Sequence, residues 1–318
     1  MLLPGKSQPV VGEHGAVSRK PLHKLSTFEY NWAKKGSFFM DLTDITDIKK
    51  TLKAFGAHTK KDLGQHFLID EKALDRIVDA ADINKSDVIV EVGPGMGILT
   101  RELCKEASQV IAVELDKTML SVVKTACIKH ANLRVENQDI LKFETNKLKS
   151  YKVVSNLPYY ITSPTIRMFL EADNKPEEMV LLVQREVAER IAAKPGRMSI
   201  LAVSVQYYGD PSIISIVPRT SFFPAPKVDS AILKIKVYKK PIFDVDKKVF
   251  FRIVRSGFSV KRKQLINSLS GGLGITRLET EKWLGKTGID PQMRAEALSM
   301  TEWHNLYRSY QELFSEKS

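Results

Sequence analysis

At residues 88–97 the chain reads VIVEVGPGMG. The apolar run from Val88 to Val92 is typical of a buried parallel strand, and glycines follow it directly. Glycines at a strand-to-helix turn let a ligand approach the backbone closely. The spacing is not the G-x-G-x-x-G of a dinucleotide site, because Gly97 comes one residue early and Glu91 puts a carboxylate where a pyrophosphate would lie. The stretch therefore predicts an α/β fold and disfavours NAD.

Two further acids follow strand-like runs. The run from Val110 to Val113 ends in Glu114, which lies 114 − 91 = 23 residues after Glu91. A carboxylate at that position is placed to bind both hydroxyls of a ribose. A third run leads to Asp139, an acid beside an apolar residue that can accept a hydrogen bond from an adenine amino group. Each acid taken alone is also compatible with a solvated strand-end charge.

The sequence NLPY at residues 156–159 follows another strand-like run. The amide oxygen of Asn156 and the Leu157 carbonyl, held rigid by Pro158, form two neighbouring hydrogen-bond acceptors, and Tyr159 adds a flat face. Such a socket suits an exocyclic amine on a planar ring, since accepting both N–H bonds favours its reactive pyramidal form without a strong general base. The alternative interpretation is a plain strand end followed by a turn.

Periodicity predicts the domain organisation. With 318 residues, two domains are the default expectation. Residues 1–39 show no sustained period and are expected to be a disordered or appended extension. Strand and helix patterns alternate through residues 40–238, as in a doubly wound sheet, with paired strands closing that domain. Residues 239–318 read as a smaller C-terminal helical domain.

The net charge of +12 is concentrated in the last third of the chain. Between Arg219 and Ile266, thirteen Lys or Arg stand against three Asp, which gives 13 − 3 = +10. A confined basic field is typical of a surface that binds phosphate backbones. We expect Lys261, Arg262 and Lys263 to lie on a helix and to contact RNA; the alternative is a solvated helix face.

Composition excludes several other classes. No run approaches the roughly 18 apolar residues of a membrane span, and no signal-peptide core is evident. The protein is therefore expected to be cytoplasmic, with no membrane partner. Cys104 and Cys127 are the two cysteines, too few for a closed zinc site, so no metal is expected.

The chain resembles the bacterial small-subunit (16S) ribosomal RNA adenine N6-dimethyltransferase family, whose relatives include the erythromycin-resistance rRNA methyltransferases. The resemblance runs from about residue 60 to about residue 299. The motifs that carry it are LGQHFLID (63–70), EVGPGMGILT (91–100), VELD (113–116), NLPYY (156–160), FFPAPKVDSAI (222–232), GFSVKRKQLINSL (257–269) and GIDPQMRAE (288–296). The last three are absent from a generic methyltransferase.

The resemblance implies a Rossmann-like S-adenosylmethionine-dependent methyltransferase domain with a C-terminal helical rRNA-binding domain. It implies that Asn156 and Tyr159 are catalytic. The implied cofactor contacts are His66, Leu68, Gly93, Glu114, Asp139 and Asn156, and the implied substrate contacts are Leu157, Tyr159, Phe222, Lys261, Arg262 and Lys263. Phe222 would stack on the target adenine opposite Tyr159, whereas Phe223 is expected to be a core residue. His66 stands where many members have Asn, and Tyr160 where Asn or His is common.

The implied reaction is an in-line displacement in which adenine N6 attacks the methyl carbon of the sulfonium, the sulfur–methyl bond breaks and S-adenosylhomocysteine is released. Two methyl groups would go to each of two adjacent adenines in the 3′-terminal hairpin of small-subunit rRNA, in an immature ribosomal particle. We expect a monomer. Three alternatives stay open: a large-subunit methyltransferase conferring antibiotic resistance, a protein glutamine methyltransferase, which would more often carry Pro at Leu157, and a non-catalytic RNA-binding assembly factor.

Overall fold

The computed structural model describes residues 41–57 and 65–314, and these residues belong to one compact unit. The expected extension at residues 1–39 lies outside the described residues. The predicted division at residue 238 stays a prediction, because one hydrophobic cluster continues from the sheet into the C-terminal helices.

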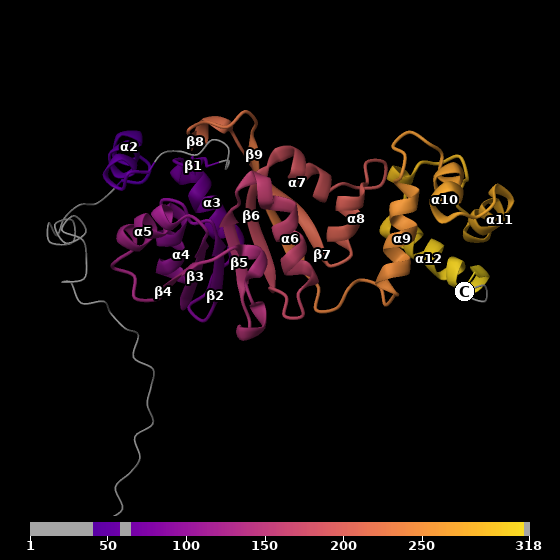
Figure 1. Ribbon diagram of the computed structural model, residues 1–318, viewed down its shortest axis with the longest axis horizontal. Helices are drawn as coiled ribbons and strands as arrows, with labels where there is room; N and C mark the ends of the chain where they lie inside the picture. The colour runs from indigo at the N-terminus through magenta and orange to yellow at the C-terminus, as the bar shows by residue number, and fades with distance from the viewer. Residues whose placement is uncertain (1–40, 58–64, 315–318) are drawn as a thin grey trace, which may run out of the picture. The chain divides into compact units, whose positions relative to one another are not determined.

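Seven strands form one sheet within the described residues, in the order β4-β3-β2-β5-β6-β9-β7 (Figure 1). The first five strands of that order are parallel. The bounds are β2 Val88–Val92, β3 Gln109–Glu114, β4 Leu133–Asn137, β5 Lys152–Asn156, β6 Glu178–Gln184, β7 Gly209–Val217 and β9 Ser230–Val237. β9 pairs antiparallel with both β6 and β7, which confirms the predicted closing pair. The strand order reverses between β2 and β5, so ligands are expected outside their carboxyl ends.

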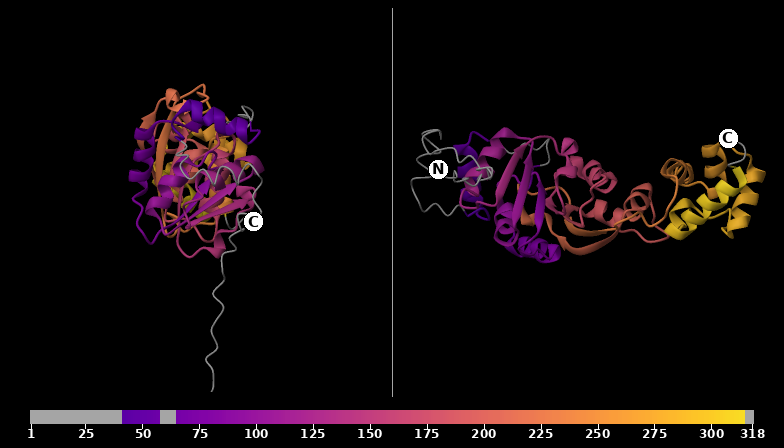
Figure 2. Two further views of the ribbon diagram at one scale, coloured as in Figure 1. Left: turned by 90° about the vertical axis from the view of Figure 1, so that its left-hand side faces the viewer. Right: turned by 90° about the horizontal axis from the view of Figure 1, so that it is seen from below.

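Helices cover both faces of the sheet (Figure 2). They are α3 Glu71–Ala81, α4 Ile98–Glu106, α5 Lys117–Ala126, α6 Thr162–Glu171, α7 Arg185–Ile191 and α8 Ile200–Gln206. Side chains alternate between the faces along a strand. In β6, Val180 and Leu182 belong to the hydrophobic cluster that includes α3 and α4 residues, while Leu181 and Val183 belong to the cluster that includes α6, α7 and α8 residues. The doubly wound fold predicted from the sequence is therefore confirmed.

The chain after β9 is helical, also as predicted. α9 Lys247–Gly257, α10 Leu265–Leu273, α11 Arg277–Thr287 and α12 Met300–Phe314 pack around Trp283 and Trp303, which are fully buried. Gly257 is required by this packing, because a Cβ atom there would lie 2.4 Å from the Trp303 ring.

A two-stranded ribbon stands apart from the main sheet. β1 Phe67–Leu68 pairs antiparallel with β8 Phe222–Phe223. Two hydrogen bonds extend the pairing: the Ile69 amide donates to the Ser221 carbonyl at 2.9 Å, and the Ser221 hydroxyl donates to Asp70 Oδ2 at 2.7 Å. Asp70 also caps α3 by accepting from the Ala73 amide. The ribbon therefore joins the segment before α3 to the segment before β9. The helix that precedes the ribbon in the chain is α2, Ile45–Ala54.

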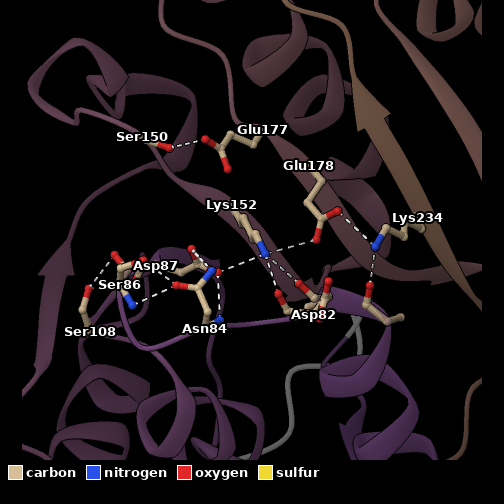
Figure 3. Close-up of polar contacts among 12 residues, drawn as sticks. Asp82, Asn84, Ser86, Asp87, Ser108, Ser150, Lys152, Glu177, Glu178 and Lys234 are labelled. Carbon is tan, nitrogen blue, oxygen red and sulfur yellow. Dashed lines mark hydrogen bonds and ion pairs between the residues drawn. The ribbon is translucent and has the colours of Figure 1, made fainter.

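A charge network ties α3 to the amino-terminal edge of the sheet (Figure 3). The buried Lys152 ammonium lies 2.9 Å from Asp87 Oδ2 and donates to the Ala81 and Asp82 carbonyls at 3.0 and 2.7 Å. Glu178 bridges Lys152 and Lys234, at 3.6 and 3.0 Å. Because the last carbonyls of a helix lack partners within the helix, Lys152 satisfies groups that would otherwise be buried unpaired.

Candidate functional site

A cavity of about 480 Å³ opens at the carboxyl ends of β2, β3 and β5, where the strand order reverses. Its walls come from the glycine loop after β2, the end of β3, the NLPY segment and residues 65–68. The site residues predicted from the sequence that line it are His66, Leu68, Gly93, Glu114, Asn156, Leu157 and Tyr159. Glu91 and Tyr160 line it as well.

The glycine loop forms one wall because it lies against NLPY. Gly93, Gly95 and Gly97 have φ of 63°, 55° and 84°, in the left-handed region that favours glycine. A Cβ atom on Gly93 would lie 3.2 Å from the Pro158 ring. A larger residue at Gly93 would therefore be strained and would also push the two loops apart.

Glu114 ends β3 and is 8% exposed. Burial raises the pKa of its carboxyl group, although hydrogen bonds from the Asp116 and Gly95 amides oppose that shift. The Asp116 amide donates to Glu114 Oε1 at 2.8 Å. This residue has the position that the sequence predicted for an acid reaching a ribose.

Glu91 is a second buried carboxyl group in the cavity wall, and it was not predicted as a site residue. It is 2% exposed, and the Thr100 hydroxyl donates to Glu91 Oε2 at 2.6 Å. Burial, with a smaller contribution from the charge of Glu114, raises the pKa of Glu91 to about 8. Its place directly before the glycine loop is the signal in the sequence that could have identified Glu91 as a site residue, beyond what its carboxylate indicates against an NAD site. Two acids in one wall favour a cationic ligand.

The NLPY residues meet in this cavity. Asn156 Nδ2 donates to the His66 carbonyl at 3.3 Å, so Oδ1 is left as the accepting end of the amide. The Leu157 amide donates to the Leu182 carbonyl at 3.1 Å, which holds the segment on β6. The Tyr159 hydroxyl lies 2.8 Å from Ser230 Oγ, and burial raises the pKa of that phenol.

His66 contacts three parts of the site. Its Nδ1 lies 2.6 Å from the Pro224 carbonyl oxygen, its own carbonyl accepts from Asn156, and its ring centroid is 5.6 Å from that of Tyr159. His66 therefore faces the loop after β8 as well as the cavity.

Asp139 does not line the cavity. It caps a short 3₁₀ turn, Ile140–Lys142, by accepting from the Leu141 amide at 3.0 Å. Asp139 is still near the cavity rim, because its charge acts on Tyr160, which lines the cavity. The pKa of Tyr160 is raised by burial first, and then by the charges of Glu114 and Asp139. Tyr160 itself is 52% exposed.

The two phenylalanines of β8 differ from expectation. Phe222 is 3% exposed and packs in the same hydrophobic cluster as Leu68, so its ring is not presented to the cavity. Phe223, expected in the core, is partly exposed, with Lys49 Nζ 5.4 Å from its ring centroid. The reason is strand alternation: Phe222 is paired with the buried Leu68 and points inward, which turns Phe223 outward.

Lys261, Arg262 and Lys263 lie in the turn between α9 and α10, so the prediction that they are helical was wrong. The helix ends at Gly257, and the next begins at Leu265. All three side chains are exposed, and they make no ion pair within the described part of the chain.

Other site classes find no support in the described residues. Among residues 41–57 and 65–314, no group of three or more His, Cys, Asp or Glu could hold a metal ion. No helix in those ranges is both long enough and apolar enough to cross a bilayer. Cys104 and Cys127 are free and buried.

Comparison with known proteins gives consistent matches. The model of the family described as ribosomal RNA adenine dimethylase matches residues 56–312. A protein of Dehalococcoides mccartyi (strain CBDB1) named ribosomal RNA small subunit methyltransferase A is 46% identical over 267 residues, covering 82% of this chain and 92% of that protein. A protein of the same name from Streptococcus equi subsp. zooepidemicus (strain H70) is 41% identical over 281 residues, covering 84% and 97%.

Solved structures agree with the fold. The 23S rRNA methyltransferase ErmE superposes with a TM-score of 0.64 at 28% identity, covering 76% of this chain and 98% of that one. A dimethyladenosine transferase from Plasmodium falciparum gives 0.65 at 27% identity, covering 77% and 97%.

Proposed function

The chain belongs to the ribosomal RNA adenine dimethylase family, and from this premise we propose that it transfers methyl groups from S-adenosylmethionine to adenine N6 in small-subunit rRNA. The observation that carries the proposal is the meeting of Asn156, Leu157 and Tyr159 with two buried acids in one cavity. The relatives named for the small subunit, at 37% to 46% identity, favour that substrate over the large subunit.

The cavity fits the proposed cofactor. Glu91 and Glu114 place two buried carboxyl groups in the cavity wall, and a cationic ligand would stabilise their ionised forms. The glycine loop lets such a ligand approach the backbone. When bound, S-adenosylmethionine supplies a methyl group activated by its sulfonium charge. Glu114 would hold the ribose, and Gly93, His66, Leu68 and Asn156 would surround the rest. Asp139 would reach the adenine from the rim, as the resemblance implies.

Three residues of the NLPY segment act on the target adenine: Asn156 and Leu157 orient its amine, and Tyr159 stacks on its ring. Asn156 Oδ1 and the Leu157 carbonyl accept the two N–H bonds, which directs the nitrogen lone pair toward the methyl group. Tyr159 stacks on the extruded base, and each such contact is worth roughly 1–3 kcal/mol. Because the pKa of Tyr159 is raised, its ring stays a neutral phenol. The second face of the base would need Phe222 to become exposed on substrate binding.

The finer expectations form part of this proposal. The targets are two adjacent adenines of the 3′-terminal hairpin, each receiving two methyl groups, and the substrate is an immature particle met in the cytoplasm by a monomeric enzyme. Lys261, Arg262 and Lys263 contact the phosphate backbone. ErmE is the reason to keep a large-subunit substrate as the second candidate.

Methyl transfer to purified small-subunit particles that lack the modification tests the proposal, with the products identified by mass spectrometry. Asn156→Ala should lower the single-turnover rate on the order of 100-fold, because the amine loses its alignment, while particle binding changes little. The exposed Asn146→Ala serves as the control. Transfer to large-subunit particles alone would select the second candidate, and particle binding without any transfer would indicate an assembly factor.

A further inference from the structure

We infer that His66 is a positioning residue that clamps the loop between β8 and β9 onto the NLPY segment and so sets the width of the target-base site. This inference rests on the proposed function and adds a role that cofactor contact alone does not require. The loop runs from Pro224 to Asp229, between the ribbon and the main sheet.

The contacts of His66 place it between two walls. A carbonyl oxygen can only accept, so the 2.6 Å contact with Pro224 requires that Nδ1 of His66 carries the proton and donates. On the other side, the His66 carbonyl accepts from Asn156 Nδ2 at 3.3 Å. One residue therefore connects the amide that would orient the target amine to the start of the β8–β9 loop.

The far end of the same loop is tied to NLPY as well. Ser230, the first residue of β9, has its hydroxyl 2.8 Å from that of Tyr159. The loop is therefore held at both ends by residues of the cavity wall, by His66 at Pro224 and by Tyr159 at Ser230. Asp229 adds support from outside, since its carbonyl accepts from the Arg185 amide and its Oδ1 accepts from the Arg219 amide.

The clamp matters because the ribbon is not part of the main sheet. β1 and β8 pair with each other, and neither pairs with any of the seven sheet strands. The spacing between the ribbon and NLPY therefore depends on contacts outside the strand pairing. His66 makes two of them directly, because its carbonyl accepts from Asn156 and its ring lies against that of Tyr159. The bond from the His66 ring to Pro224 holds the β8–β9 loop to the same residue. A displacement of about 1 Å at such a site can cost on the order of 100-fold in rate.

Three substitutions separate the clamp from other roles of the imidazole. The side-chain nitrogen of Asn lies near the position of Nδ1, whereas that of Gln reaches toward Nε2. His66→Ala and His66→Gln should therefore lose the bond to Pro224, and His66→Asn should keep it. The control is His130→Ala, which removes an imidazole whose ring makes no hydrogen bond within the described residues and does not line the cavity.

Two measurements give the readout. At saturating cofactor and particle, the single-turnover rate should fall between roughly tenfold and 100-fold in His66→Ala and His66→Gln, and His66→Asn should recover to within about threefold of the wild type. Amide hydrogen exchange at residues 225–230 should be faster by roughly tenfold in the first two variants, as expected for the loss of one hydrogen bond, and unchanged in His66→Asn and His130→Ala.

The outcomes are distinguishable. Equal behaviour of His66→Asn and His66→Gln, or unchanged loop exchange in His66→Ala, would overturn the clamp. A loss that disappears when cofactor is saturating would assign His66 to cofactor binding alone and would also overturn it. If the wild type transfers no methyl group, the proposed function fails, but hydrogen exchange still reports whether the clamp exists.

Discussion

At the scale of single residues, the cavity combines burial with negative charge. Glu91 and Glu114 lie at or beside the ends of neighbouring strands, and burial raises the pKa of both carboxyl groups. Placing such groups beneath a ligand site has a cost in stability, because each prefers to be neutral while buried. A cationic ligand reverses that preference by stabilising the ionised form. The pair therefore makes sense as a binding feature more than as a folding feature.

The buried carboxyl group of Glu91 should make stability depend on pH. Its pKa is about 8 in the folded protein, against an ordinary value of 4.5. Between those values the folded protein holds a proton that the unfolded chain has lost, so the free energy of unfolding falls as pH rises. Glu91→Gln cannot ionise and keeps an acceptor for Thr100. Its stability relative to the wild type should therefore increase from pH 5 to pH 8, by up to about 1.4 kcal/mol per pH unit.

Urea denaturation without cofactor at pH 5, 6.5 and 8 measures this difference. Glu106→Gln, on the exposed end of α4, should show no such trend. A constant difference between Glu91→Gln and the wild type across the three pH values would mean that Glu91 is already ionised in the folded protein.

Glu114 should contribute directly to cofactor affinity. Glu114→Ala removes an acceptor for the two ribose hydroxyls, and hydrogen bonds to a charged group are worth about 1.5–3 kcal/mol. Calorimetric titration with S-adenosylmethionine should show a corresponding rise in Kd. Glu136→Ala, on the adjacent strand β4 and outside the cavity lining, is the matched control. Equal affinity for Glu114→Ala and the wild type would remove the ribose assignment.

At the scale of elements, the three adjacent cations Lys261, Arg262 and Lys263 lie in a turn between two helices, and this position favours a binding role. Because α9 ends at Gly257 and α10 begins at Leu265, Lys261, Arg262 and Lys263 project from a connection and are not spread along a helix. Loops carried on a packed scaffold commonly provide binding residues. Three adjacent cations on one such turn suit a phosphate backbone better than they suit a packed helix face.

Replacing Lys261, Arg262 and Lys263 with Gln should weaken RNA binding in a salt-dependent way. Each phosphate contact adds about 0.7–0.9 to the slope of log K against log salt, so the slope should flatten by roughly two to three. Filter binding to small-subunit particles over a salt series measures the slope. Exposed lysines at 124, 129 and 142, changed together to Gln, form a control of equal charge. Equal slopes for the two triple variants would move the search for the RNA contact to Arg185, Arg190, Lys194 and Arg197.

At the scale of the whole molecule, the two ends of the parallel strands carry different structures. The carboxyl ends of the parallel strands hold the cavity, and the amino ends carry the network around Lys152, Asp87 and Glu178 (Figure 3). The network fixes the end of α3, the helix that directly follows the ribbon.

Lys152→Met should destabilise the protein substantially. It leaves Asp87, the last carbonyl of α3 at Ala81 and the carbonyl of Asp82 without their buried cation. Breaking a buried ion pair typically costs about 3–5 kcal/mol. Urea denaturation measures the change. Lys147→Met is the control, because the Lys147 pair with Glu144 is exposed and surface substitutions usually cost less than about 0.5 kcal/mol. A loss below about 1 kcal/mol for Lys152→Met would mean that water replaces the ammonium group.

The sequence by itself determined the strand pattern, the glycine loop and the acid at Glu114, since these features are read over a few residues whose periodicity follows from backbone geometry. It also indicated that Asn156 and Tyr159 follow a strand end. The helical reading of Lys261, Arg262 and Lys263 was wrong, because a short turn between two helices leaves a weak local signal. The ribose role of Glu114 and the amine-accepting role of Asn156 followed from residue type and spacing, whereas the roles of His66, Leu68, Gly93 and Phe222 came from the resemblance.

Only the tertiary structure decided which of these residues meet. The contact between His66 and Pro224 joins positions 158 residues apart, and no local pattern encodes it. The inward turn of Phe222 follows from its pairing with Leu68, and the raised pKa of Glu91 follows from its burial beside Glu114. Register, burial and the approach of two carboxyl groups are properties of packed surfaces, so they appear only when strands distant in the chain are brought side by side.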